Sequence, residues 1–199
     1  MAQHHGRIFE SIWNHKFKDL GIDPSELIIA DIGANVGYSV EDLAKHFPKT
    51  TIYCYEPVPS NYEKLLEKVG HHTNCKFYNY GLGEEDKTVK IGISKERELN
   101  FGLFSTLHPE GNLSQEIALK NINNEPSPHI LKIDVEGMEY DLIETAKQYL
   151  TNTKIVVYEH LREGHVNYNR HDDIPALLNS LGFEYIQSEG PYNKYYYKK

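Results

Sequence analysis

The sequence has few sulfur-containing residues, one tryptophan and a shortage of positive charge. Its 199 residues include two cysteines and two methionines, and 21 lysines and arginines stand against 29 acids, a formal net charge of −8 at pH 7. With a sequence pI of about 5.8, we predict no nucleic-acid partner and no anionic membrane partner. Cys54 lies near the end of one predicted strand and Cys75 at the start of the next, which are opposite edges of a parallel sheet, so we expect free thiols in the reducing cytoplasm and no disulfide.

Long apolar runs are also missing from the chain. No stretch approaches the roughly 20 apolar residues of a membrane helix, and residues 1–6 lack the apolar core of a signal peptide. We therefore predict no membrane span. The content of 39% hydrophobic and 25% charged residues is typical of a globular protein, and the length fits one domain, residues 1–199. Nothing in the sequence indicates an oligomeric state.

The most informative stretch is Leu27–Gly37. It begins with an apolar run that is typical of a buried parallel strand. A turn containing Gly33, Asn35 and Gly37 follows Asp31, and apolar residues then recur with helical spacing as far as Phe47. Strand, glycine-rich turn and helix in this order form the first half of a nucleotide-binding unit.

This turn does not match the dinucleotide-binding fingerprint. A pyrophosphate site has the pattern Gly-x-Gly-x-x-Gly, whereas here Asn35 replaces the middle glycine and an acid, Asp31, precedes the turn. A carboxylate disfavours phosphate and favours hydroxyl-bearing or cationic ligands. A ligand with a ribose, an ammonium and no phosphate fits better, which points to S-adenosylmethionine (SAM). An ordinary tight turn of an α/β protein is the alternative at this point.

Strands and helices alternate along most of the chain. The sequence predicts an α/β fold: a doubly wound (Rossmann-like), mostly parallel seven-stranded sheet that ends in a C-terminal antiparallel hairpin. An amphipathic N-terminal helix over residues 7–20, within a cap of residues 1–22, packs on the sheet or covers the ligand cleft. The strands after the first are expected at residues 51–55, 76–80, 130–135, 155–158, 183–187 and 192–197.

The stretch between the third and fourth of these strands is the least regular. Gly81 to Gly83 is expected to form a loop at the ligand-binding edge of the sheet, and residues 88–93 the return strand of a hairpin. Residues 94–128 are rich in turn-forming residues, and we interpret them as a substrate-facing insert that contains a helix from Leu113 to Lys120.

Acidic residues end several predicted strands. Glu56, followed by Pro57, ends the second strand, where a carboxylate can accept hydrogen bonds from ribose hydroxyls. Asp134 and Glu136 follow the fourth strand, where they could bind an ammonium, orient an acceptor hydroxyl or take its proton. His160, at the end of the fifth strand, is either a general base or a structural histidine. No histidine or acid pair has the spacing of a zinc site, and no metal is predicted.

Four motifs in the right order resemble one family. The segments Asp31–Gly37, Tyr55–Pro57, Leu131–Gly137 and Glu159–His160 together resemble the FkbM family of class I SAM-dependent methyltransferases, over Leu27 to His160. The resemblance implies transfer of a methyl group from SAM, usually to an oxygen of a sugar, a glycolipid or a polyketide-like product.

The resemblance also implies a set of site residues. It places Asp134 and Glu136 at the methyl-donor site. Together with His160, taken from its position at a strand end, they are the predicted catalytic residues, with Asp134 or His160 accepting the proton of a hydroxyl. The residues expected to bind the cofactor are Asp31, Gly33, Asn35, Gly37, Glu56, Pro57, Gly81 and Asp134. Two alternatives stay open: a non-catalytic subunit that binds SAM or a nucleoside, and a nicotinamide-dependent oxidoreductase, against which the missing glycine counts.

Overall fold

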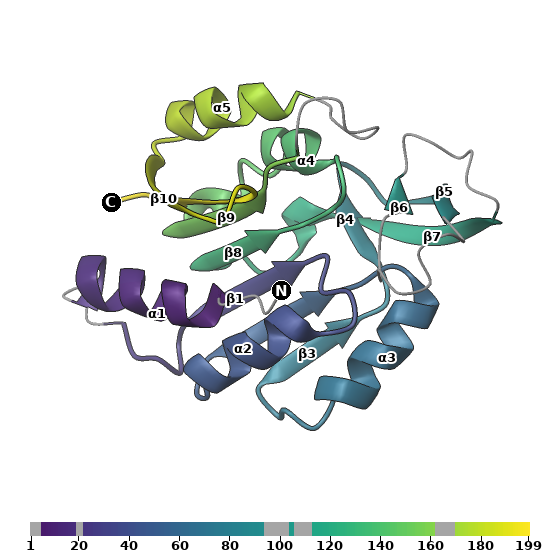
Figure 1. Cartoon of the computed structure of the whole chain (residues 1–199), viewed down its shortest axis with the longest axis horizontal. Coiled ribbons are helices and arrows are strands. Elements are labelled where there is room, and N and C mark those ends of the chain that lie inside the picture. Colours follow the sequence, from purple (N-terminus) through teal and green to yellow (C-terminus); the bar gives the residue numbers. More distant parts are fainter. Residues whose placement is uncertain (1–4, 19–21, 94–103, 106–112, 162–169) are drawn as a thin grey trace.

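The computed structural model describes residues 5–18, 22–93, 104–105, 113–161 and 170–199. Its central element is a seven-stranded sheet with the order β10-β11-β9-β8-β1-β2-β3 (Figure 1). The strands are β1 (Ile28–Ile32), β2 (Thr51–Tyr55), β3 (Cys75–Tyr78), β8 (Ile130–Ile133), β9 (Ile155–Glu159), β10 (Glu184–Glu189) and β11 (Asn193–Tyr197). The first five run parallel to their neighbours, and β10 and β11 form an antiparallel hairpin that pairs with β9. The predicted fold class is confirmed.

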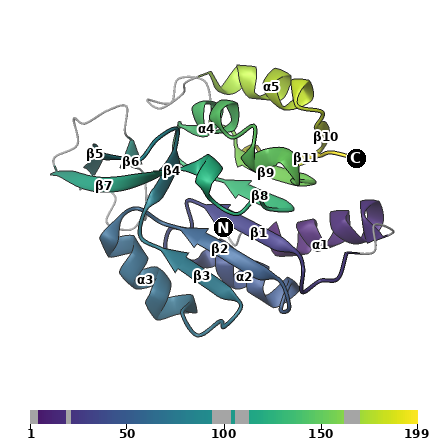
Figure 2. The same ribbon diagram turned by 180° about the vertical axis from the view of Figure 1, so that it is seen from behind.

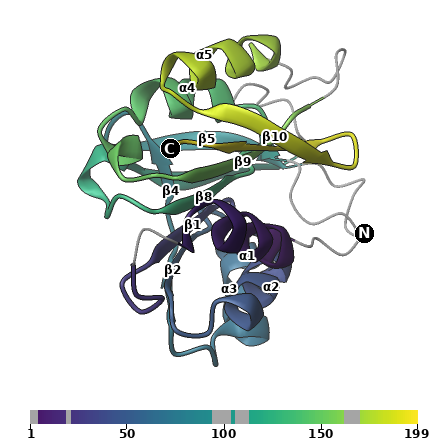
Figure 3. The same cartoon turned by 90° about the vertical axis from the view of Figure 1, so that its left-hand side faces the viewer.

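Helices cover both faces of this sheet. Figure 3 shows α1, α2 and α3 below the sheet and α4 and α5 above it. Their bounds are α1 (His5–Lys16), α2 (Tyr38–His46), α3 (Pro59–Val69), α4 (Glu139–Thr145) and α5 (Ile174–Ser180). Three short 3₁₀ turns, η3 (Ile122–Asn124), η4 (Tyr149–Thr151) and η5 (His171–Asp173), lie between them in the chain.

Neighbouring residues of each strand belong to different cores. Ile29 packs with the apolar faces of α1, α2 and α3, whereas the next residue, Ala30, packs with α4 and α5. The same alternation separates Ile130 from Leu131 on β8. Side chains of successive strand residues point to opposite faces, so a sheet covered on both sides needs an uninterrupted apolar run. This is why the apolar run that starts at Leu27 predicts a central strand correctly.

The N-terminal helix packs on the sheet. Phe9, Ile12 and Trp13 of α1 are buried in the same core as Val40 and Leu43 of α2. The sequence left open whether this helix packs on the sheet or covers the ligand cleft, and the structure shows that it packs on the sheet. Cys54 and Cys75 are free thiols, as predicted. In the described part of the chain, no helix is both long and apolar enough to cross a bilayer.

A second, four-stranded sheet occupies the segment between β3 and β8 (Figure 2). It has the order β4-β7-β5-β6, with β4 (Gly81–Gly83), β5 (Lys87–Ile93), β6 (Phe104–Ser105) and β7 (Leu113–Asn121). Two predictions are wrong here. Gly81 to Gly83 is a strand parallel to β7 instead of a loop, and β5 pairs with β6 and β7 instead of folding back on the third strand of the large sheet.

The predicted helix from Leu113 to Lys120 is also wrong, since this segment is strand β7. The residues are good helix formers, but buried Ile117 and Leu119 alternate with exposed Glu116, Ala118 and Lys120, a period of two. Pairing with both β4 and β5 outweighs the local propensity. Residues 94–103 and 106–112 of the predicted insert lie outside the described residues.

Candidate functional site

One pocket lies at the carboxyl ends of the parallel strands. Residues after β1, β2, β8 and β9 form one side of it, and Ile91, Ile117 and Leu119 of the second sheet form the other. Its volume is about 280 Å³. Open α/β sheets bind ligands at this edge. The predicted site residues that line it are Gly33, Asn35, Glu56, Pro57, Gly81, Asp134 and Glu136.

The glycine-rich turn brings the chain close to the end of β8. Gly33 has a φ of 84°, and a Cβ added there would overlap the carbonyl oxygen of Asp134. Asn35 follows with a φ of 50°. Both conformations are left-handed, where glycine has no steric cost and asparagine has a small one. The turn therefore presents backbone, and not bulky side chains, to the pocket.

Asp31 lies beneath this turn and not in the pocket. It is fully buried, accepts a hydrogen bond from the Ser39 hydroxyl, and accepts another from Lys132 Nζ at 2.9 Å. Lys132 Nζ also lies 3.4 Å from Asp134 Oδ2. Burial disfavours the charged ammonium, but the two carboxylates outweigh burial and raise the pKa of Lys132. Lys132 therefore compensates the charge of Asp31 inside the protein. From the turn sequence alone, we expected a ligand to interact with this charge.

Glu56 joins the turn to the end of β2. Its Oε2 accepts the N–H of Asn35 and its Oε1 accepts the N–H of Val58, both at 2.9 Å. The side chain is 4% exposed, and burial raises the pKa of Glu56 to about 7 in spite of these bonds. Each carboxylate oxygen has a second lone pair, so the group can still accept hydroxyl donors from the pocket.

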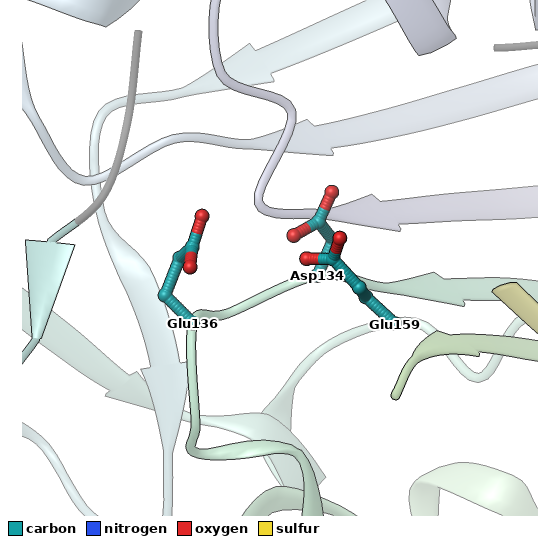
Figure 4. A group of neighbouring side chains, drawn as sticks. All are labelled: Asp134, Glu136 and Glu159. Atoms are coloured by element: carbon teal, nitrogen blue, oxygen red, sulfur yellow. The ribbon is translucent and has the colours of Figure 1, made fainter. Parts of the chain in front are cut away.

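Three acids gather at the opposite end of the pocket. Oxygens of Asp134, Glu136 and Glu159 lie within 4.8 Å of one another, and Figure 4 shows Asp134 and Glu159 side by side with Glu136 across from them. Burial, followed by the charge of Asp134, raises the pKa of Glu159 to about 8. Near neutral pH Glu159 therefore holds its proton. Such oxygens can bind an ammonium, or a divalent cation in place of the proton.

Two other predicted residues do not line the pocket. Gly37, with a φ of 90°, begins α2, and a Cβ there would come within 2.8 Å of Leu65 Cδ1. Its role is to let α3 pack closely against the turn. His160 donates its backbone N–H to the Tyr192 carbonyl at 2.8 Å, and its Nε2 lies 3.9 Å from Asp172 Oδ1. The strand brings Glu159, and not His160, to the pocket.

Sequence reasoning did not assign site roles to Glu159, Asn61 and Glu139. Glu159 follows Tyr158, which is paired with Ile133, so it stands beside Asp134. Successive residues of a strand point in opposite directions, and this alternation could have indicated that Glu159, and not His160, faces the pocket. Asn61, 4% exposed, lines the pocket and hydrogen-bonds Glu56. Glu139 is fully buried, and no pattern in the sequence marks it as a site residue.

Comparison with known families identifies this arrangement. The model of the methyltransferase FkbM domain matches residues 31–185, which include the turn, the acidic ends of β2, β8 and β9, and the start of β10. The chain belongs to the FkbM methyltransferase family. The resemblance seen in the four sequence motifs is thereby confirmed.

Two curated methyltransferases are similar to this FkbM chain at low identity. "Methyltransferase 1" of Beauveria bassiana is 24% identical over 161 residues, which cover 68% of this chain and 65% of that protein. The "2-O-methyltransferase NoeI" of Sinorhizobium fredii is 22% identical over 167 residues, with 70% and 65% covered. The matched part of this chain thus spans just under two thirds of either relative.

Solved structures show the same fold. An FkbM methyltransferase from Methylobacillus flagellatus superposes with a TM-score of 0.58 at 16% identity, covering 92% of this chain and 46% of that one. A methyltransferase from Geobacter sulfurreducens gives 0.58 at 9% identity, with 100% and 80% covered. At these identities the likeness concerns the Rossmann-like fold alone.

Proposed function

We propose that this chain transfers a methyl group from SAM to a hydroxyl oxygen of a sugar, a glycolipid or a natural product. The observation that carries the proposal is the union, in one pocket, of a glycine turn, the Glu56 carboxylate and the acids around Asp134. Membership of a methyltransferase family supports methyl transfer. The name of the NoeI relative supports oxygen as the acceptor atom.

The residues of the pocket fit the three parts of SAM. Glu56 has free lone pairs for ribose hydroxyls. Val58, two residues after Glu56, gives an apolar contact for an adenine ring. The acids at the other end suit the ammonium of the methionine part, and a pocket rimmed by carboxylates opposes the diphosphate of a dinucleotide.

The chemical step needs little from the protein beyond position and one proton acceptor. When bound, SAM would supply a methyl group on a sulfonium: an oxygen nucleophile bonds to the methyl carbon, and the C–S bond breaks to release S-adenosylhomocysteine. A hydroxyl acceptor must lose its proton as the new bond forms. Asp134 is placed to accept it, because it lines the pocket and its neighbour Glu159 already carries a proton near neutral pH. His160 lies outside the pocket, so Asp134 is the candidate that we retain.

The acceptor enters a pocket with an apolar side and an acidic side. Strands β5 and β7 supply the apolar side, and β7 lies within residues 94–128, the segment that we expect to face the substrate. An acidic rim would repel a phosphate backbone, which favours a small-molecule or glycan acceptor over nucleic acid. The free thiols Cys54 and Cys75 fit the reducing cytoplasm in which we place the reaction.

Calorimetric titration with SAM, S-adenosylhomocysteine and NAD⁺ tests the donor. We expect the two adenosyl compounds to bind and NAD⁺ not to bind; the reverse would make the chain a nicotinamide-dependent protein. A labelled-methyl assay against a panel of carbohydrates, glycolipids and natural products then tests transfer. Donor binding without transfer to any acceptor would instead favour a non-catalytic binding subunit.

Asp134→Asn tests the proton acceptor once an acceptor compound is known. The substitution keeps the size of the side chain and removes its basicity, so we expect turnover to fall by about 10²- to 10⁴-fold, with a much smaller change in SAM affinity. Rapid-mixing or steady-state assays with labelled SAM measure both. Turnover equal to that of the wild type would remove Asp134 from the proton transfer.

A further inference from the structure

The loop between β8 and α4 carries two of the three pocket acids in an unusual backbone conformation. Glu136 has a φ of 53° and Gly137 a φ of 108°, both left-handed. A glutamate in this region is uncommon and costs energy unless its surroundings hold it there. The loop begins after the last paired residue of β8. The N–H of Asp134 still donates to the Ile32 carbonyl of β1 at 3.0 Å, so the sheet fixes Asp134 but not the residues that follow it.

Glu139 is the residue that holds this loop. Its Oε1 accepts the N–H of Val135 at 2.8 Å, and its Oε2 accepts the N–H of Gly137 at 2.9 Å. The side chain is fully buried. Val135 lies between Asp134 and Glu136, and Gly137 follows Glu136. The two charge-assisted bonds therefore clamp the backbone on each side of Glu136.

A histidine links the same carboxylate to the end of β9. His171 Nε2 lies 3.0 Å from Glu139 Oε2, and His171 is also fully buried. The backbone N–H of Leu161 donates to His171 Nδ1 at 3.2 Å. Because Nδ1 accepts there, the ring proton stands on Nε2 and faces Glu139. Leu161 is two residues beyond Glu159, so this chain of contacts connects the strand ends that carry all three pocket acids.

We propose that Glu139 is a positioning residue of the donor site. It does not line the pocket. Through the N–H groups of Val135 and Gly137 it sets the place of Glu136 and the path of the chain after Asp134. Through His171 it couples this loop to the end of the strand that carries Glu159. The inference rests on the proposed function, and specifically on these acids binding the amino-acid part of the donor, while the nucleoside part is held at Glu56.

Two ligands that differ in that amino-acid part test the proposal. S-Adenosylhomocysteine carries it, and 5′-methylthioadenosine does not. In Glu139→Gln, one amide group must replace a carboxylate between two N–H donors, so one loop contact is lost. We expect S-adenosylhomocysteine to bind about tenfold more weakly by calorimetry, and methylthioadenosine to bind within twofold of the wild type. Asp141→Asn, which removes an exposed acid from the first turn of the same helix, is expected to change neither.

The other outcomes are decisive as well. Unchanged binding of S-adenosylhomocysteine by Glu139→Gln overturns this inference alone, and an equal loss of both ligands reduces Glu139 to a general structural role. A wild-type chain that binds neither ligand overturns the proposed function and this inference with it. If Glu139→Gln does not fold, His171→Gln keeps the carboxylate and removes its link to Leu161. A loss confined to S-adenosylhomocysteine supports the proposal there, and no loss refutes it.

Discussion

Glu56 gives the sharpest prediction, because its two carboxylate oxygens have known and different partners. The N–H groups of Asn35 and Val58 each donate to one oxygen at 2.9 Å. In Glu56→Gln only one of these N–H groups keeps an oxygen acceptor, and the amide NH₂ meets the other. The variant also has one fewer oxygen to offer to a ribose. We therefore expect weaker nucleoside binding without loss of the fold.

The expected magnitude follows from the bonds that are lost. A hydrogen bond to a charged group contributes about 1.5–3 kcal/mol, which corresponds to roughly a 10- to 150-fold change in Kd. Ionising buried Glu56 at a pKa of about 7 in place of its ordinary 4.5 costs roughly 3 kcal/mol. The variant avoids this cost but leaves an N–H group unsatisfied, so its free energy of unfolding should change much less than its affinity.

The pH dependence of binding is the second measurement. The ionised carboxylate accepts hydroxyl donors better than the neutral acid, so affinity for 5′-methylthioadenosine should rise as the pH increases through about 7, the pKa of Glu56. This ligand has the ribose but no ammonium, so titration of the other pocket acids affects it little. Calorimetry at pH 6, 7 and 8 measures the rise, which Glu56→Gln should lack. Equal affinities of variant and wild type, or the same pH profile in both, would refute the ribose role.

Three further predictions concern the acid cluster and its support. The pKa of Glu159 is raised from 4.5 to about 8. The folded state therefore holds this proton more tightly than the unfolded state, and the stability of the ligand-free protein falls as the pH rises from about 4.5 to 8. Urea denaturation of Glu159→Gln should show a smaller fall, and an identical fall would contradict the raised pKa. Lys132→Met leaves Asp31 buried without its cation, and the free energy of unfolding should drop by about 3–5 kcal/mol; a drop below 1 kcal/mol would show that the pair is not needed. The sequence predicts no metal, so dialysis against EDTA and later addition of Mg²⁺ should leave the affinity for S-adenosylhomocysteine unchanged, whereas tighter binding with Mg²⁺ would place a cation among the acids.

Local sequence patterns were sufficient to predict the strands of the large sheet. The central strands β1, β2, β8 and β9 are largely apolar. The turn after Ile32 needs left-handed residues, which the sequence supplies as Gly33 and Asn35. Acids at strand ends could be placed in one cleft because parallel strands end at one edge. Glu56 and Asp134 were found in this way.

The misplaced elements depend on partners far away in the chain. Gly81 to Gly83 is a strand only because β7, more than 30 residues later, pairs with it. Asp31 appears in the sequence as a ligand-binding acid, and its partner Lys132 is 101 residues away. His160 was preferred to Glu159 because an imidazole is the more usual base, whereas strand parity decides which side chain faces the pocket.

The apolar wall of the pocket belongs to a small cluster of its own. Val58, Ile91, Ile117 and Leu119 pack together and are separate from the two cores that stabilise the large sheet. Exchanging Ile91 or Ile117 for smaller or larger side chains therefore reshapes the ligand cavity at little expense to the main scaffold. Specificity for the methyl acceptor can therefore change through these residues while the residues that bind the nucleoside stay the same. They are the positions at which to begin engineering that specificity.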